Sequence, residues 1–599
     1  MDHEEIPYPV KAYGEKYRSL HKQHTEETFE ELLRTAKIDA PANAALNKTI
    51  RNLQRRLEAL KSSLGKMHFF RGLLIFIAIA GIGSGIWVLL QFVFPDFFRE
   101  MRLPVEWGTG GAAAGVIALL LILKLLNPRI RRSRELFAKM DELCNSKISE
   151  AWRQMAPLNR LFRWDTVAGI VMKTLPIVTV DKFFSQGRME QLCRQFSWAP
   201  GSREDESVLC CQSGALNGNP WVMAEVLRQE WKTVTYTGSL QISWEERVSY
   251  TDSDGRRHTR WETRYETLTA SVEEPAPVYG RRKFMVYGNE AAPDLCFSRK
   301  PNSLSGAGQG FFGRLRMRSA IRALEARSRD LDDPFVIMDN RAFDACFAAA
   351  DRDNEQQFRL LFTPLAQQEM LTLLRDRKSG FGDDFSFVKD HMINILFSDH
   401  LDETDLAADP NRFRNYDLEA LKENFFSYSE SFFRSFYFTL APLLCIPLYQ
   451  QHRNFRDIYA GVLDSESGSF YEYESLVNAM DREEFAPEDA ATQLILKTGS
   501  GKAEGHGEKV QVTAHAFACE ERLTYVRTRG GDGKWHDVPV HWKKYLPRTK
   551  TSEVIVAHAP EEETELPAAE KYRQLVENFH GRIGTIRFRR SLMAFLREQ

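Results

Sequence analysis

The hydropathy pattern is dominated by two long apolar stretches near the start of the chain. Gly72–Phe94 carries no charged side chain, and Trp107–Leu126 carries only Lys124. As helices, which rise about 1.5 Å per residue, both match the roughly 30 Å hydrocarbon core of a bilayer. The long charged segment before the first stretch disfavours a signal peptide, and core helices of soluble proteins rarely lack charge over such a length. The pattern predicts a two-helix transmembrane hairpin, residues 69–127, in direct contact with the lipid bilayer.

Small residues recur in both stretches at helical spacing. Gly81 and Gly85 form one Gly-x3-Gly pair, and Gly111 and Gly115 form another. Such pairs let helix backbones approach closely in lipid, within one hairpin or between two copies, although glycine is also common in membrane spans generally. Neither stretch has a central acidic, histidine or arginine residue, so no ion or proton path is indicated.

A heptad pattern continues from the membrane stretches into their flanks. Before the first stretch, apolar residues alternate in steps of four and three at Leu46, Ile50, Leu53, Leu57, Leu60, Leu64 and Met67. After the second, a looser stripe follows at Ile130, Phe137, Met140 and Cys144. The spacing predicts a short coiled-coil-like stalk, either antiparallel within the chain or parallel between copies.

Basic residues are concentrated beside the two predicted spans. Seven lie between Lys48 and Arg71 against one acid, and six lie between Lys124 and Lys139 against one acid. The connecting loop, Pro95–Glu106, has no such excess. By the positive-inside rule, both termini are expected in the cytoplasm.

Two later regions show the period-two pattern of β-strands. Leu240, Ile242, Trp244, Val248 and Tyr250 precede an Asp-Gly turn, after which Trp261, Thr263, Tyr265 and Thr267 alternate with Arg260, Glu262, Arg264 and Glu266. This predicts a β-hairpin with one aromatic face and one salt-bridged face, the latter more typical of a solvated face than of a binding site. A similar plan, which suggests a degenerate internal repeat of the first hairpin, recurs at Val510, Val512, Leu523, Tyr525, Arg529–Gly533, Val538, Val540 and Trp542.

A third apolar stretch, Ser435–Tyr449, is shorter and contains Pro442 and Pro447. It is too short and too interrupted for a comfortable span. We expect a buried core segment, with an interfacial or re-entrant element as the alternative.

Together these patterns predict an α+β membrane protein: a two-helix transmembrane hairpin, a helical coiled-coil-like stalk, and a large mixed α+β cytoplasmic body containing aromatic β-hairpins. The expected regions are N-terminal cytoplasmic helices and stalk (1–68), transmembrane hairpin (69–127), post-membrane helical segment (128–200), β-rich module (201–300), helix-strand-helix block (314–400), helical aromatic-rich segment (401–490), and C-terminal β-rich module ending in a helix (491–599).

Net charge and cysteine spacing indicate neither a nucleic-acid partner nor a metal site. The net charge of −2 gives no general attraction to nucleic acid, so no nucleic-acid partner is expected. The eight cysteines are scattered without a CxxC spacing, which fits reduced thiols in the cytosol and disfavours a common structural zinc site.

Four tempting motifs fail on particular positions. Gly308–Gly313 matches GxGxxG but does not follow a predicted strand, and Gly499–Lys502 is followed by Ala503 where a P-loop needs Ser or Thr. Asp252 and Asp254 lack the remaining calcium-loop ligands. The histidine pairs His391/His400, His506/His515 and His536/His541 have no ligand or triad spacing. The sequence therefore predicts no catalytic, cofactor-binding or metal-binding residue and no cofactor.

The order of elements resembles an uncharacterised bacterial family, domain of unknown function 3137, over about residues 46–400. The resemblance rests on the heptad helix, the two spans, the segment Lys232–Gly238, and the block Asp339–Pro364 with Phe343, Phe347, Asp351, Glu355 and Thr363 before a helix through Leu371–Leu374. It implies a two-span bacterial inner-membrane protein and supplies no reaction.

Three functions follow as hypotheses. The first is a membrane-anchored, cytoplasm-facing interaction or scaffold protein that binds a protein partner or itself. The second is a subunit of a membrane transport or envelope-stress complex, and the third is an enzyme whose site is assembled from residues distant in sequence. We expect binding rather than catalysis, because every motif for catalysis fails.

Overall fold

The computed structural model describes residues 5–94, 104–200, 204–251, 257–306, 311–330, 332–349, 351–451, 467–504, 507–558, 583–589 and 592–597. It is a mixed α+β structure with two compact units. One unit contains residues 27–162 and 410–427, and the other contains residues 1–26, 163–409 and 428–599. We refer to them as the helical unit and the mixed unit, and the helices α2 (Arg18–Ala36) and α13 (Leu418–Leu444) contribute residues to both.

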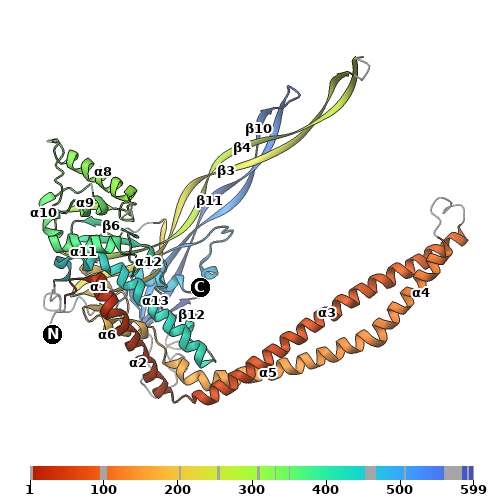
Figure 1. Cartoon of the computed structure of the whole chain (residues 1–599), viewed down its shortest axis with the longest axis horizontal. Coiled ribbons are helices and arrows are strands. Elements are labelled where there is room, and N and C mark those ends of the chain that lie inside the picture. Colours follow the sequence, from red (N-terminus) through yellow and green to blue (C-terminus); the bar gives the residue numbers. More distant parts are fainter. Residues whose placement is uncertain are drawn as a thin grey trace. The chain divides into compact units, whose positions relative to one another are not determined.

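The helical unit is built on long helices that run through both apolar stretches. Its elements are α3 (Ala40–Val93), α4 (Val105–Leu121), η2 (Ile122–Leu126), α5 (Asn127–Leu161) and the short η3 (Pro410–Arg412). Asp39 begins α3 by accepting a hydrogen bond from the Ala42 N–H, and a proline occupies its first turn. By length and composition, the α3 stretch and the continuous α4–α5 stretch are each able to cross a membrane (Figure 1).

Glycines lie where α3 and α4 approach each other. A Cβ added at Gly81 would collide with the Gly111 carbonyl oxygen, and one added at Gly85 would come within 2.9 Å of the Ala112 Cβ. A Cβ at Gly115 would come within 3.1 Å of the Ala78 carbonyl oxygen. The two Gly-x3-Gly pairs therefore meet within one chain, as close helix packing requires.

Outside the apolar stretches, the N-terminal half of α3 packs against α5 along the predicted heptad positions. Ile50 and Leu53 of α3 form a cluster with Cys144 and Ala151 of α5, with Leu46, Leu57, Met140, Ile148 and Tyr416 around it. Towards the apolar stretches, Leu60, Leu64 and Met67 are only half-buried. The seam is therefore tightest at the end that lies farther from the apolar stretches.

Over the described residues, the mixed unit contains two antiparallel sheets. In the first, the strand order is β1-β2-β3-β4-β7-β6-β5. The strands are β1 (Val178–Val180), β2 (Glu206–Leu216), β3 (Asn219–Thr251), β4 (Arg257–Gly288), β5 (Cys296–Arg299), β6 (Phe385–Asp390) and β7 (Ile393–Ser398).

In the second sheet, the order is β12-β13-β11-β10-β8, and β9 pairs with β10. Its strands are β8 (Ile495–Thr498), β9 (Lys502–Glu504), β10 (Gly507–Arg529), β11 (Trp535–His558), β12 (Ile583–Arg589) and β13 (Leu592–Arg597). The sequence predicted a C-terminal module that ends in a helix. The last described elements are instead strands: β13 pairs on one side with β11 and on the other with β12.

Helices fill the space around and between these sheets. They are α1 (Pro9–Ala12), η1 (Tyr13–Tyr17), α6 (Thr166–Thr174), α7 (Gln186–Phe196), α8 (Phe311–Arg327), α9 (Arg341–Phe347), α10 (Glu355–Leu361), α11 (Pro364–Arg375), α12 (Asp399–Asp402), η4 (Pro447–Gln450), α15 (Phe470–Asn478) and η5 (Arg482–Phe485). Helix α15 packs on both sheets: Leu476 belongs to a core cluster with strands of the second sheet, and Tyr471 to one with strands of the first.

The third apolar stretch is buried in the mixed unit. Its residues from Phe436 to Tyr449 are almost all inaccessible to solvent, and Tyr437 donates a hydrogen bond to the Pro9 carbonyl oxygen. Pro442 lies inside α13, and Pro447 begins η4. The prediction of a buried core segment at Ser435–Tyr449 is confirmed.

Candidate functional site

Two long β-ribbons extend beyond the sheets to which they belong (Figure 1). Strands β3 and β4 pair from Trp221 to Thr251, whereas β2 accompanies β3 only as far as Arg228 and β7 accompanies β4 only over Met285–Gly288. Strands β10 and β11 likewise continue as a pair to the turn between Arg529 and Trp535. We call residues 229–251, 257–284 and 516–553 the twin-ribbon arm.

The two ribbons support each other through a small apolar core. Ile242 and Leu268 of the first ribbon pack with Val538 and Val540 of the second. At Gly238 an added Cβ would collide with the Pro539 carbonyl oxygen, so the backbones come very close there. Because an isolated two-stranded ribbon is only marginally stable in water, this mutual packing explains how both ribbons extend so far.

The strand register places the aromatic residues of the first ribbon on opposite faces. Directly opposed residues of an antiparallel pair share a face. Trp244 is opposite Arg264, on the face packed against the second ribbon, whereas Tyr265 is opposite Ser243, on the other face. The predicted separation into one aromatic and one salt-bridged face is therefore wrong, because it assumed a register that the two strands do not adopt.

The outer faces of both ribbons expose aromatic side chains to solvent. Trp261 and Tyr265 of the first ribbon are 66% and 69% exposed, and Tyr525 and Trp535 of the second are 62% and 60% exposed. Exposed hydroxyl residues continue along the same face of the first ribbon, from β3 Thr233, Thr235, Thr237, Ser239 and Ser243, and from β4 Thr263, Thr267, Thr269 and Ser271. The arm thus presents rigid aromatic groups beside hydrogen-bonding groups, a combination found at protein-binding surfaces.

A separate cluster of titratable side chains lies at the edge of the first sheet. Cys296 begins β5 and is paired across the strands with Asp390, the last residue of β6, and His391 follows directly. The Cys296 Sγ is 3.5 Å from the His391 Nδ1 and 3.7 Å from the Asp390 Oδ1. The His391 Nδ1 is 2.7 Å from the same Asp390 oxygen.

Two further charged residues adjoin this cluster. The Cys296 N–H donates to Asp353 Oδ1 at 2.7 Å, and burial together with the neighbouring Asp353 carboxylate raises the pKa of the Cys296 thiol. Burial lowers the pKa of the Lys389 ammonium to about 7. The Lys389 Nζ donates to the Ala291 and His391 carbonyl oxygens. The cluster is not a nucleophilic triad, because the thiol and the carboxylate both contact the same imidazole nitrogen.

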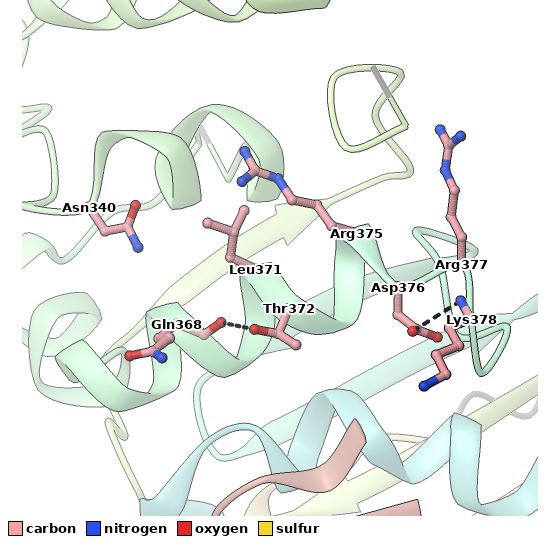
Figure 2. A pocket seen from close by; sticks show the side chains of 8 residues that line it. All are labelled: Asn340, Gln368, Leu371, Thr372, Arg375, Asp376, Arg377 and Lys378. Atoms are coloured by element: carbon pink, nitrogen blue, oxygen red, sulfur yellow. Dashed lines mark hydrogen bonds between the residues drawn. The ribbon is translucent and has the colours of Figure 1, made fainter. Parts of the chain in front are cut away.

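A hollow of about 540 Å³ lies beside α11, and Figure 2 shows its lining. Arg375, Arg377 and Lys378 bring positive charge to it. Arg377 donates to the Gly306 carbonyl oxygen, and the Arg375 guanidinium lies 3.7 Å from the Cys346 sulfur. Asp376 accepts hydrogen bonds from the N–H groups that follow it, including that of Gly380. These contacts hold the end of α11 and the next loop, which is a structural role.

The structure places the rejected sequence motifs as follows. Lys502 begins strand β9, whereas a P-loop lysine begins a helix. His400 contacts the Phe381 carbonyl oxygen, and His536 contacts Asp532. Gly308, Gly310, Asp252, Asp254 and His506 lie outside the described residues. Only His391 of the described histidine pairs joins a cluster of potential ligands. Asp390 adjoins it in the sequence, whereas Cys296, which the sequence did not point to, is far away along the chain.

Comparison of the chain with known protein families, with characterised proteins and with solved structures found no match in any of the three. The resemblance to domain of unknown function 3137 is therefore neither supported nor contradicted by them.

Proposed function

We propose that this chain is a membrane-anchored interaction protein whose twin-ribbon arm binds a protein partner. The observation that carries the proposal is a pair of exposed aromatic side chains on the outer face of each ribbon, Trp261 and Tyr265 on the first and Tyr525 and Trp535 on the second. Aromatic residues of this kind supply a large contact area at a low cost in side-chain entropy and are enriched at protein interfaces.

The backbone of the arm supports a protein as the partner. Within the described residues, each ribbon has only two strands over most of its length, so its outer edges have N–H and C=O groups without a strand beside them. A further strand from a partner can pair with such an edge. The exposed threonine and serine hydroxyls add donors and acceptors that suit a polar interface rim.

The anchor and its orientation belong to the same proposal. Residues 69–127 would cross the bilayer as an antiparallel hairpin, continued by the α3–α5 seam as a coiled-coil-like stalk. The basic flanks would keep both termini in the cytoplasm, and the resemblance to domain of unknown function 3137 would place the protein in a bacterial inner membrane. The arm would then meet its partners on the cytoplasmic side of the membrane.

Site-specific photo-crosslinking in native membranes tests this proposal. A photoreactive phenylalanine analogue replaces Tyr265 or Trp535 on the arm, and Leu360 of α10, which is 58% exposed, serves as the matched control. We expect a discrete crosslinked protein from both arm positions and none from position 360. Equal products from all three positions, or none from the arm, would refute the arm as the binding surface. A fourth chain carries the photoreactive residue at Ile117 on α4. Crosslinked products from this position alone would favour the alternative function, a subunit of a membrane complex.

A further inference from the structure

Two segments far apart in the sequence bring three potential metal ligands together in the mixed unit, and a third segment places a carboxylate beside one of them. Cys296 comes from the start of β5, Asp390 and His391 from the turn that joins β6 to β7, and Asp353 from the loop before α10. The β5–β6 pairing sets Cys296 directly opposite Asp390. The backbone N–H of Cys296 holds the Asp353 carboxylate beside it at 2.7 Å.

The Cys296 sulfur lies close to the spacing of a tetrahedral metal site from the other two ligand atoms. With metal–sulfur bonds of about 2.3 Å and metal–nitrogen or metal–oxygen bonds of about 2.0–2.1 Å, neighbouring ligand atoms lie roughly 3.3–3.6 Å apart. The distances from the Cys296 Sγ to the His391 Nδ1 and the Asp390 Oδ1 are 3.5 and 3.7 Å. The 2.7 Å distance between the nitrogen and oxygen needs only a small opening, which these two exposed side chains can make.

We propose that Cys296, Asp390 and His391 bind a Zn²⁺ ion, with Asp353 or a water molecule completing the coordination. A thiolate and an imidazole favour Zn²⁺ over Mg²⁺ and Ca²⁺, which take oxygen ligands. Binding removes the proton from the thiol and replaces the hydrogen bond between His391 and Asp390 with two metal bonds. This site is independent of the twin-ribbon arm, and its test does not depend on any partner.

The neighbouring Lys389 does not occupy the ligand positions. Its ammonium donates to the carbonyl oxygens of Ala291 and His391, which are backbone acceptors outside the ligand set. The alternative to a metal site is a hydrogen-bonded cluster in which Asp390 pairs with His391 and the thiol lies beside them. The two alternatives differ in their response to Zn²⁺ and to loss of the thiol.

The test uses the full chain purified in detergent, stripped with a chelator and reloaded with Zn²⁺ or with Co²⁺ as a spectroscopic probe. The variants are Cys296→Ser and Asp390→Asn, and Cys519→Ser, which removes a partly exposed thiol on the arm, is the matched control. Metal content, a zinc competition titration and the thiolate-to-Co²⁺ charge-transfer band are measured. Circular dichroism confirms that each variant is folded.

We expect about one equivalent of zinc and a thiolate-to-cobalt band in the unmodified chain and in Cys519→Ser. Cys296→Ser should lose the band, and both Cys296→Ser and Asp390→Asn should bind zinc at least about tenfold more weakly. Substoichiometric zinc in the unmodified chain, or equal affinity in the unmodified chain and Cys296→Ser, would overturn the proposal. Because Cys296 lies at a sheet edge and is partly exposed, its replacement by serine is compatible with the fold.

Discussion

At the scale of single residues, burial controls the chemistry of His21. Its ring stacks on Phe433 with ring centroids 4.1 Å apart, and its nitrogens contact the Thr174 hydroxyl and the Ser429 carbonyl oxygen. Burial lowers the pKa of His21 from 6.5 to about 4. The folded mixed unit therefore holds this imidazole in its neutral form at pH 7.

This shift predicts that the mixed unit loses stability in acid. The unfolded chain binds a proton at His21 below about pH 6.5, whereas the folded chain does so only below about pH 4, so the loss develops between these values and reaches about 3 kcal/mol. His21→Gln, which cannot titrate, should flatten the pH dependence of the unfolding free energy in that window. Denaturant titrations at pH 7, 5.5 and 4.5 measure it. An unchanged slope in the variant would show that His21 is not the group responsible.

At the scale of elements, close backbone approach holds both paired structures together. In the helical unit, Gly81 lets α3 contact α4, and in the arm Gly238 lets the first ribbon contact the second. Each structure also contains a glycine that faces open space: Gly83 in α3 and Gly280 in β4. These four positions separate the effect of helix or strand propensity from the effect of packing.

In the helical unit, Gly81→Val should separate α3 from α4, whereas Gly83→Val should not. The added side chain at Gly81 collides with backbone atoms of α4, which cannot move aside as a flexible side chain can. We expect a strongly reduced yield of disulfide crosslinks between engineered cysteines at Ala78 and Ala118 in the first variant only. Similar yields in both variants would mean that the helices do not pack at these glycines.

In the arm, Gly238→Val should part the ribbons, and Gly280→Val should leave them together. The first substitution forces a side chain into the Pro539 carbonyl oxygen and disturbs the small core of Ile242, Leu268, Val538 and Val540, at a cost of about 1–3 kcal/mol. Hydrogen exchange of the amides in residues 536–546 should become faster in Gly238→Val alone. Protection that is equal in both variants would contradict the proposed support between the ribbons.

Periodicity in the sequence was enough to predict the long helices and the two β-ribbons, because each pattern is local. The faces of the first ribbon were not predictable from alternation alone, since the pairing of Trp244 with Arg264 depends on register. The cluster at Cys296 was hidden for a similar reason. Strand pairing brings Cys296 beside Asp390, and no local spacing in the sequence predicts that contact.

At the scale of the whole molecule, we propose that a membrane anchor holds a body that works in the cytoplasm. The anchor rests on two apolar helices, and the orientation rests on the basic residues that flank them. A cysteine introduced at Leu103, in the loop between the two apolar stretches, would report which side of the membrane the loop faces, but Leu103 lies outside the described residues. Trp107, in the first turn of α4 and 73% exposed, lies close to it in sequence, and Cys519 reports on the arm.

The most direct test of this claim is labelling of intact cells that produce the chain with a thiol reagent that cannot cross the membrane. Two single-cysteine chains are compared, one with Trp107→Cys and one that retains Cys519. We predict that the reagent labels position 107 from outside, and that it labels Cys519 only after the inner membrane is permeabilised. Labelling of Cys519 in intact cells, or protection of position 107 until permeabilisation, would contradict a membrane-anchored protein with a cytoplasmic arm.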